Sequence, residues 1–117
     1  MPSKTSYTSG IYFFQNIITK RKYIGSSIDT DKRIACHLNK LRQNKHQNKD
    51  MQKDFNSIGE AGFIYGILEL VFDPAMLFNR ESYYISKETG LYNTGVIAVK
   101  IDLSENDVLR FLKGITI

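Results

Sequence analysis

The alternation of apolar and polar positions near the start of the chain predicts a β-hairpin. Residues 10–15 and 22–27 have the composition of strands, and the polar, basic segment between them has the composition of a loop. Both faces of the first strand carry apolar side chains, with Ile11 and Phe13 on one face and Tyr12 and Phe14 on the other. We therefore expect this strand to be covered on both sides.

Helical spacing follows the hairpin. Apolar side chains recur at the i, i+4 and i+7 positions of an amphipathic helix that begins near residue 30, namely Ile34, Leu38 and Leu41. Ser27, Asp29 or Thr30 could cap this helix. A second short helix is expected over residues 47–59, with Gly59 as its stop and three inward side chains: Met51, Phe55 and Ile58.

The second half of the chain predicts one more strand and one more long helix. Residues 63–70 are β-rich, and a helix is expected to start with Asp73 as cap and Pro74 in its first turn and to end at Gly90. An extended segment and a small helix should follow. The order β-β-α-α-β-α indicates an α+β fold with a small antiparallel sheet.

Size and composition restrict the class of protein. The 117 residues fit one compact domain, 1–117, and 42% hydrophobic residues are enough for a core. The single cysteine, Cys36, excludes an internal disulfide and a cysteine-rich zinc site. The sequence contains no apolar run long enough to cross a bilayer and no secretory signal, so we expect no membrane partner and a cytoplasmic setting.

Charge is distributed unevenly along the chain. Between residues 20 and 53 there are ten basic and three acidic residues, so this third carries +7, while the net charge of +4 leaves −3 for the remainder. Such an asymmetry indicates a polyanionic partner, most commonly nucleic acid. A solvated, lysine-rich helix pair would give the same count, so charge alone does not decide.

Glu81 lies where an apolar residue is expected. On the helix that follows Pro74, the buried stripe consists of Leu77, Tyr84 and Ile85, and Glu81 falls within it. A buried carboxylate must be paired or must bind a cation. Two interpretations stay open: a structural salt bridge, to Arg33 or near Arg80, or a ligand for Mg²⁺, which often takes one carboxylate together with water and phosphate.

The helix near residue 30 also carries polar side chains at its core margin. Arg33 and His37 are one turn apart, so a guanidinium that could fork onto a phosphate lies beside an imidazole. Tyr12 could be a core residue or could act in proton transfer. Gly25 could mark a bulge or strand end, or could let a nucleotide or another backbone come close.

Five ordered elements in this sequence resemble the GIY-YIG nuclease domain, and in particular its phage-borne homing endonuclease branch. They are Gly-Ile-Tyr at 10–12, Tyr-Ile-Gly at 23–25, Arg33 with His37, His46 with the segment FNSIG, and NRESYYISKETGLYN with Glu81 and Asn93. The resemblance covers about residues 8–97. It implies a three-stranded antiparallel sheet flanked by helices and a DNA endonuclease that uses one Mg²⁺ or Mn²⁺ ion per active site.

The resemblance also implies a role for each matching residue. Glu81 would hold the metal, Tyr12 would be the general base or a proton relay, and Arg33 would stabilise charge on the phosphate. Tyr23 and His37 would orient water and Tyr12, and Asn93 would brace the site. We expect four residues to contact DNA: Lys22, Gly25, Ser26 and His46.

The end of the chain departs from the family pattern. Homing relatives usually carry a linker and a separate DNA-binding module, whereas residues 98–117 form a short extension with three basic and three acidic side chains. We expect it to pack as a strand or helix or to form a dimer contact. Specificity would then come from the nuclease core, a homodimer or a separate targeting protein.

Three functions remain open at this stage. The first is an active endonuclease of a phage or mobile element that attacks competing DNA, in the host cytoplasm if phage-encoded. The second is a nucleic-acid-binding domain of the same fold that has lost catalysis. The third is a small interaction protein with a basic face.

Overall fold

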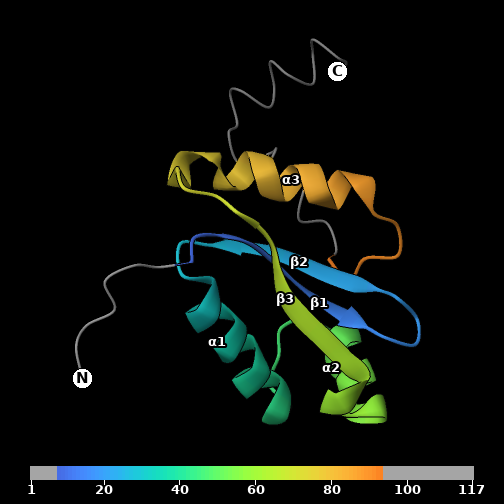
Figure 1. Ribbon diagram of the computed structural model, residues 1–117. Helices are drawn as coiled ribbons and strands as arrows, with labels where there is room; N and C mark the ends of the chain where they lie inside the picture. Colours follow the sequence, from blue (N-terminus) through green and yellow to red (C-terminus); the bar gives the residue numbers. More distant parts are fainter. Residues whose placement is uncertain (1–7, 94–117) are drawn as a thin grey trace, which may run out of the picture.

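A computed structural model describes residues 8–93, and the order of the elements within them is the predicted one (Figure 1). The strands are β1 (Gly10–Asn16), β2 (Lys22–Ser27) and β3 (Phe63–Leu70), and the helices are α1 (Thr30–Arg42), α2 (Lys49–Ile58) and α3 (Leu77–Lys87). Short 3₁₀ turns precede β3 and α3, at Glu60–Gly62 and Pro74–Met76. The strand, helix or dimer contact expected beyond residue 93 lies outside the described residues.

The three strands form one antiparallel sheet in the order β2-β1-β3, which confirms the predicted α+β fold. Tyr12 pairs with Gly25 across β1 and β2, and Phe14 pairs with Tyr23. Because directly opposed residues share a face, Tyr12 and Tyr23 lie on the same side of the sheet. The hairpin register therefore decides which side chains of the two motifs can meet.

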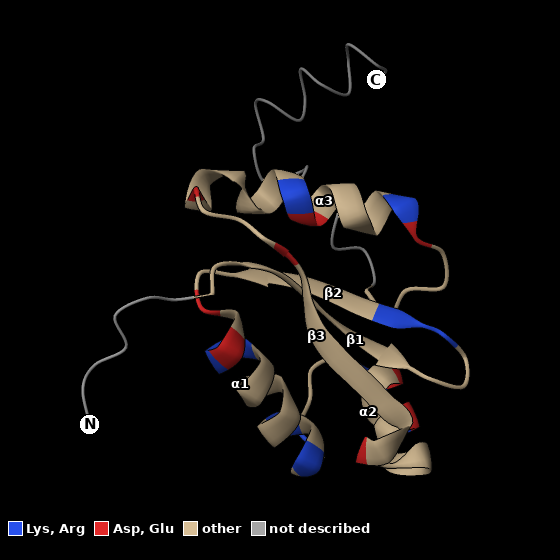
Figure 2. Cartoon of the chain, viewed as in Figure 1, with Lys and Arg blue, Asp and Glu red and all other residues tan. Residues whose placement is uncertain are grey.

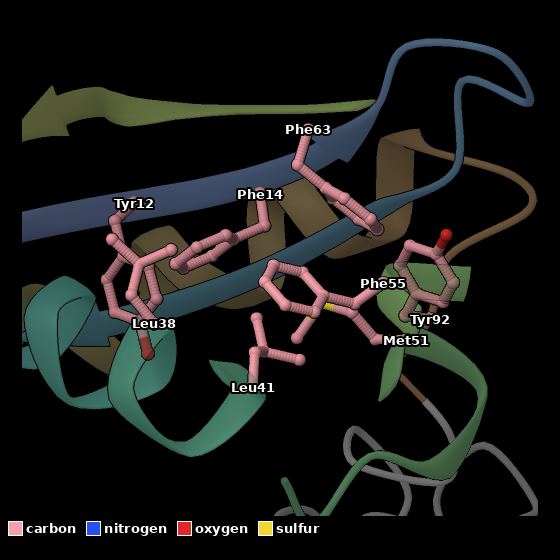
Figure 3. Packing of buried hydrophobic residues seen from close by; sticks show 8 residues of the cluster. All are labelled: Tyr12, Phe14, Leu38, Leu41, Met51, Phe55, Phe63 and Tyr92. Atoms are coloured by element: carbon pink, nitrogen blue, oxygen red, sulfur yellow. The ribbon is translucent and has the colours of Figure 1, made fainter. Parts of the chain in front are cut away.

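Helices cover both faces of β1, as its two apolar faces predict. On one face, Tyr12 and Phe14 pack with side chains of α1 and α2 and with two aromatic neighbours in a single cluster (Figure 3), completed by Leu38, Leu41, Met51, Phe55, Phe63 and Tyr92. On the other face, α3 covers an aliphatic cluster made of Ile11, Ile24, Val71 and Ile85. The sheet thus separates an aromatic core from an aliphatic one.

The ends of α1 and α2 follow from local hydrogen bonds. Asp29 caps α1, since its carboxylate accepts from the Lys32 amide. Asn48 caps α2 in the same way through the Met51 amide, and Gly59 ends α2 at a φ of 81°. A positive φ favours glycine, so the predicted stop is confirmed.

The start and end of the last helix differ from the prediction. Asp73 does accept from a backbone amide, that of Ala75, but the Met76 amide bonds the Asp73 carbonyl three residues back, and this closes a 3₁₀ turn. The α-helix therefore begins at Leu77. It ends at Lys87 because Glu88 is already extended, with φ −108° and ψ 154°.

Part of the positive charge of residues 20–53 is paired with acidic side chains in the folded chain. Two of its cations pair with acids from outside the segment: Lys22 with Glu88 at 3.1 Å and Arg42 with Glu60 at 2.7 Å. Figure 2 shows the basic residues of α1 and β2 with acidic residues nearby on α2 and at the end of α3. The local excess of +7 is therefore partly neutralised by folding.

Candidate active site

The candidate site is built around Tyr12 in the middle of β1. Its side chain is 2% exposed, and Oη lies 2.7 Å from Nε2 of His37 on α1. Burial raises the pKa of Tyr12 above its usual range, and the Arg33 guanidinium, which hydrogen-bonds the phenol, partly opposes that rise. The phenol is therefore held between an imidazole and a guanidinium.

Gly25 makes the position of Tyr12 possible. A Cβ at residue 25 would lie 2.3 Å from Tyr12 Oη and 2.4 Å from its Cζ. Any side chain there would displace the phenol. The space that the sequence analysis assigned to a nucleotide or another backbone is filled by the Tyr12 ring, and contact of Gly25 with DNA remains a prediction.

Gly10, the glycine of the other motif, serves the sheet. A Cβ at this position would lie 2.2 Å from the Glu69 carbonyl oxygen of β3. At Gly10, therefore, a neighbouring backbone comes close, as was expected for Gly25. The two glycines thus serve different purposes. Gly10 leaves room for the backbone of β3, and Gly25 leaves room for the Tyr12 side chain.

Tyr23 borders the same interior. Its ring meets the His37 ring edge-on at 5.2 Å and the His46 ring at 6.1 Å between centroids. Burial raises its pKa, Arg33 lowers it and Glu81 raises it further. The two motif tyrosines, Arg33 and a carboxylate are therefore near enough to influence one another electrostatically.

His37 and His46 form a buried pair. They are 5% and 4% exposed, their rings stack at 28° with centroids 4.9 Å apart, and Nδ1 of His37 lies 2.7 Å from Nε2 of His46. Burial lowers the pKa of His37 to about 3 and that of His46 to about 4. Both rings are therefore neutral near pH 7.

The burial of His46 corrects one expectation. The resemblance to the nuclease family placed His46 among the expected DNA contacts. The structure instead directs its ring at His37, beneath the sheet. Its place is the interior of the site.

Arg33 is exposed on the first turns of α1, next to the phenol. It borders a surface hollow whose lining comes from the end of β2 and the start of α1: Ser27, Ile28, Asp29, Lys32, Arg33 and Cys36. A guanidinium at the rim of a hollow and hydrogen-bonded to a tyrosine has the chemistry to fork onto a phosphate. Arg33 is the site's cationic group toward solvent.

Glu81 reaches the same region from the opposite face of the sheet. It is 5% exposed within the stripe of α3, as predicted, and its Oε1 accepts a hydrogen bond of 2.9 Å from Ser26 Oγ. Ser26 pairs with Ile11 and so points to the α3 face. Arg80, a suggested partner of Glu81, forks onto Glu69 of β3 instead.

The strand β2 joins the two halves of the site. Its alternation places Gly25 under the phenol and Ser26 against the carboxylate, one residue apart. Glu81 raises the pKa of both Tyr12 and Tyr23, which shows that its charge is felt across β2. The site therefore wraps around the β2 edge of the sheet.

Asn93 holds that edge in place. Its side chain accepts from the Ile24 amide at 2.9 Å and donates to the Ile24 carbonyl at 2.8 Å, so it pairs with β2 as a further strand would. Lys22 lies farther along β2, in its pair with Glu88. Contacts of Lys22 and Ser26 with DNA remain predictions.

A metal ion at this site would depend on Glu81. Within residues 8–93 there is no group of three or more His, Cys, Asp or Glu side chains that could hold an ion. A buried carboxylate that accepts from a hydroxyl suits Mg²⁺, which takes one or two carboxylates and completes its shell with water and phosphate. The donor set therefore fits a hard divalent cation and does not fit zinc.

Asn48 and Gln52 hold His46 in place through contacts that were not predicted from the sequence. The backbone amide of Asn48 donates to Nδ1 of His46 at 3.0 Å, and the Gln52 side chain accepts from the His46 amide at 2.9 Å. The asparagine at the head of α2 is the signal that could have located this frame, as a helix N-cap. The buried glutamine had no such signal.

Comparison of the sequence with known proteins identifies a family and several relatives. A family model described as the GIY-YIG catalytic domain matches residues 8–93. The chain is 28% identical over 79 residues to intron-associated endonuclease 1 of Enterobacteria phage T4, covering 68% of this chain and 32% of that protein. It is 34% identical over 97 residues to a probable intron-encoded endonuclease 1 of Neurospora crassa, covering 76% and 31%. The chain thus spans about a third of these relatives.

Solved structures agree with the sequence relatives. The catalytic domain of the homing endonuclease I-TevI superposes with a TM-score of 0.66 at 29% identity, over 73% of this chain and 96% of that one. A variant of the I-TevI catalytic domain gives a TM-score of 0.61 at 30% identity, over 68% and 81%. The three-stranded sheet with its three helices matches that catalytic fold. No helix in residues 8–93 is both long and apolar enough to cross a membrane.

Proposed function

Because this chain belongs to the GIY-YIG catalytic domain family and is homologous to intron and homing endonucleases, we propose that it is a divalent-metal-dependent DNA endonuclease. The reaction would be hydrolysis of phosphodiester bonds. The observation that supports the proposal is the arrangement at the β2 edge, where the Tyr12 phenol lies beside the Arg33 guanidinium and over Gly25, and the Glu81 carboxylate bonds the neighbouring Ser26. These groups come from three separate elements of the chain.

Tyr12 and Arg33 would act on the attacking water and on the phosphate. A water between the phenol oxygen and the phosphorus would give its proton to the Tyr12 oxygen. Tyr12 would act as base if its own proton had already left to solvent, or as relay if it passed that proton to solvent in the same step. The guanidinium would fork onto non-bridging oxygens and stabilise the charge that builds there. Arg33 also lowers the pKa of Tyr12, so the same guanidinium would act on both the phosphate and the phenol.

The remaining residues would orient these groups. Tyr23 and His37 border the phenol and would position it and the water. Asn93 would keep β2 in register, so that Gly25 and Ser26 stay between the phenol and the carboxylate. Ser26 would hold Glu81 in one rotamer through its hydroxyl.

Glu81 would hold one Mg²⁺ or Mn²⁺ ion together with water and a phosphate oxygen. The bound cation would supply Lewis-acid stabilisation of charge at the scissile phosphate and at the leaving oxygen. The carboxylate fits this task because Mg²⁺ takes oxygen ligands, often one or two carboxylates together with water and phosphate.

The substrate would be DNA, approached from the side of Arg33 and β2, with Lys22 and Ser26 as further contacts. A single site cuts one strand at a time, so nicking is expected of a monomer. Double-strand cleavage would need two active sites, as in a homodimer, or sequential attack by one site. Sequence choice would come from the nuclease core, from a homodimer or from a separate targeting protein. A phage or mobile-element enzyme that attacks competing DNA in the host cytoplasm would fit these properties.

A plasmid-nicking assay tests the proposal. Supercoiled plasmid should be nicked with Mg²⁺ and left intact with a chelator, and linear and branched DNA should be compared in parallel. Glu81→Ala and Tyr12→Phe should each slow nicking by about 10²–10⁴-fold. Full activity in both variants would remove the catalytic assignment.

The alternative is a nucleic-acid-binding domain of this fold without catalysis. Such a domain would retain DNA without cutting it under any metal, with an affinity that falls steeply as salt rises. An affinity insensitive to salt would leave only the third possibility, a protein-interaction domain.

A further inference from the structure

The buried histidines lie in a chain of hydrogen bonds that starts at a backbone amide. The Asn48 N–H donates to Nδ1 of His46 at 3.0 Å. Nε2 of His46 lies 2.7 Å from Nδ1 of His37, and Nε2 of His37 lies 2.7 Å from Oη of Tyr12. Each ring nitrogen of both histidines therefore has one partner, and the chain ends at the phenol.

The first link fixes the direction of all the others. A backbone N–H can only donate, so Nδ1 of His46 must be bare and its proton must sit on Nε2. That proton faces His37, whose Nδ1 must then be bare in turn. The proton of His37 consequently lies on Nε2, and the Tyr12 oxygen must accept it.

The same geometry excludes a charged histidine. An imidazolium carries protons on both ring nitrogens, but Nδ1 of His46 already accepts from Asn48 and Nδ1 of His37 already accepts from His46. Burial acts in the same sense, because both pKa values are lowered. The pair is therefore neutral and has one orientation.

The frame around His46 is rigid for reasons of its own. The His46 backbone amide donates to Oε1 of Gln52, and Nε2 of Gln52 donates to the Leu41 carbonyl. These two bonds determine the orientation of the Gln52 side-chain amide. The Asn48 side chain caps α2 by accepting from the Met51 amide. The first turn of α2 thus holds the ring and its backbone donor together.

We propose that His46 is a positioning residue that, under the control of the Asn48 amide, locks His37 as a permanent hydrogen-bond donor to Tyr12. This inference deepens the proposed endonuclease function and rests on it. His37 cannot accept the phenol proton, because its Nε2 already carries one. The proton of Tyr12 must therefore pass to a solvent water on the side away from the histidines, as the phenol oxygen takes up the proton of the attacking water. The His37 N–H and Arg33 would stabilise negative charge on the phenol oxygen during this exchange.

The direction of the chain can be measured without any cleavage assay. The protein contains two histidines, so ¹⁵N-histidine labelling gives spectra from two rings alone. Long-range ¹H–¹⁵N correlation at pH 7 should show a protonated Nε2 and a bare Nδ1 in both rings, and a His46→Gln spectrum would assign His37. A protonated Nδ1 in either ring, or an imidazolium at pH 7, would overturn the proposal.

A pair of substitutions tests the consequence for catalysis. In His46→Gln a side-chain amide can still donate to His37, whereas His46→Phe keeps a ring but has no donor. The phenylalanine variant should lose about 10- to 100-fold in kcat for nicking with KM little changed, and the glutamine variant should recover at least part of that loss. Equal rates for the two variants would refute the donor role.

The two measurements separate this inference from the proposed function. If the wild-type protein does not cut DNA but shows the expected tautomers, the endonuclease assignment fails and the hydrogen-bond direction stands. If it cuts DNA with the opposite tautomers, the endonuclease assignment stands and the positioning role of His46 is wrong.

Discussion

The two faces of the sheet treat their buried polar groups in different ways. On the face covered by α1 and α2, a tyrosine and two histidines bond to one another and to a backbone amide inside an aromatic core. On the face covered by α3, an aliphatic core encloses one carboxylate, Glu81, that accepts from a hydroxyl at the strand edge. One half of the site is built on a network of neutral groups, and the other half presents a carboxylate.

The difference indicates a division of labour. A neutral network whose donors and acceptors are paired is stable without any ligand, so the phenol should be positioned before substrate arrives. Carboxylate oxygens are ligands that Mg²⁺ accepts, so that half should respond to divalent ions. Variants on the two faces should therefore fail in different assays, as follows.

Among the changes that compare the two faces, loss of Arg33 should have the largest effect, because this residue would link the phenol to the phosphate. Arg33→Ala should slow nicking by about 10³-fold, through lost charge stabilisation and a further rise in the pKa of Tyr12. Lys53→Ala, an exposed cation on α2, is the control and should change the rate little. Similar losses from both substitutions would show that Arg33 acts only through general charge.

Gly25→Ala tests whether the phenol must be held in its observed position for cleavage. The new Cβ would lie 2.3 Å from Tyr12 Oη, so the ring must move, at a cost of about 1–3 kcal/mol in stability and about 10²-fold in rate. Gly66→Ala is a matched control, since its Cβ would lie 3.4 Å from Phe13. Urea unfolding and nicking rates measure both effects, and an active Gly25→Ala variant would contradict the assigned packing.

Mild acid should destabilise the face that holds the histidines. Their pKa values of about 3 and about 4 in the folded protein lie below that of an unfolded histidine, so only the unfolded chain takes up protons between pH 6.5 and 5. Stability should fall with decreasing pH there, by about 1.4 kcal/mol per pH unit for each histidine kept neutral. Urea unfolding at pH 7 and 5 checks this.

The control for acid sensitivity is the double variant His37→Gln with His46→Gln. It should lose most of the pH dependence between pH 6.5 and 5, because carboxylates titrate mainly below that window. A wild-type slope that matches the slope of the double variant would mean that the histidines are not buried as neutral rings.

The smallest effect is expected at the strand edge that joins the two halves. Asn93→Ala removes both bonds to the Ile24 backbone and should cost about 1–2 kcal/mol of stability. Asn39→Ala, exposed on α1, should cost much less. Urea midpoints compare them, and equal midpoints would show that Asn93 does not brace β2.

Much of the fold was predictable because its signals are local. The alternation in the first strand predicted burial on both faces, and the α1 stripe, the Gly59 stop and the third strand at 63–70 all agree with the structure. Asp73 and Pro74 were harder to interpret, since the same residues start an α-helix or a 3₁₀ turn. Which of the two forms depends on whether the first bond spans three residues or four.

The chemistry of the site was only partly predictable. Glu81 could be singled out from the sequence because a charged residue within the apolar stripe of a helix is unusual. The burial of His46 could not be anticipated, because it depends on a bond to His37 across nine residues, and the Asn48 side chain indicates only a helix cap and not the bond of its backbone amide to His46. The space at Gly25 was anticipated, but its occupant follows from strand register, which sequence spacing does not determine.

The central claim is that Tyr12 and Glu81, on opposite faces of the sheet, act on one scissile phosphate, and a double-mutant cycle tests it most directly. Nicking rates would be measured for the wild type, Tyr12→Phe, Glu81→Gln and the double variant. Groups that act as one unit are strongly non-additive, so the double variant should be little slower than the slower single variant. Losses that multiply in full would contradict a shared site.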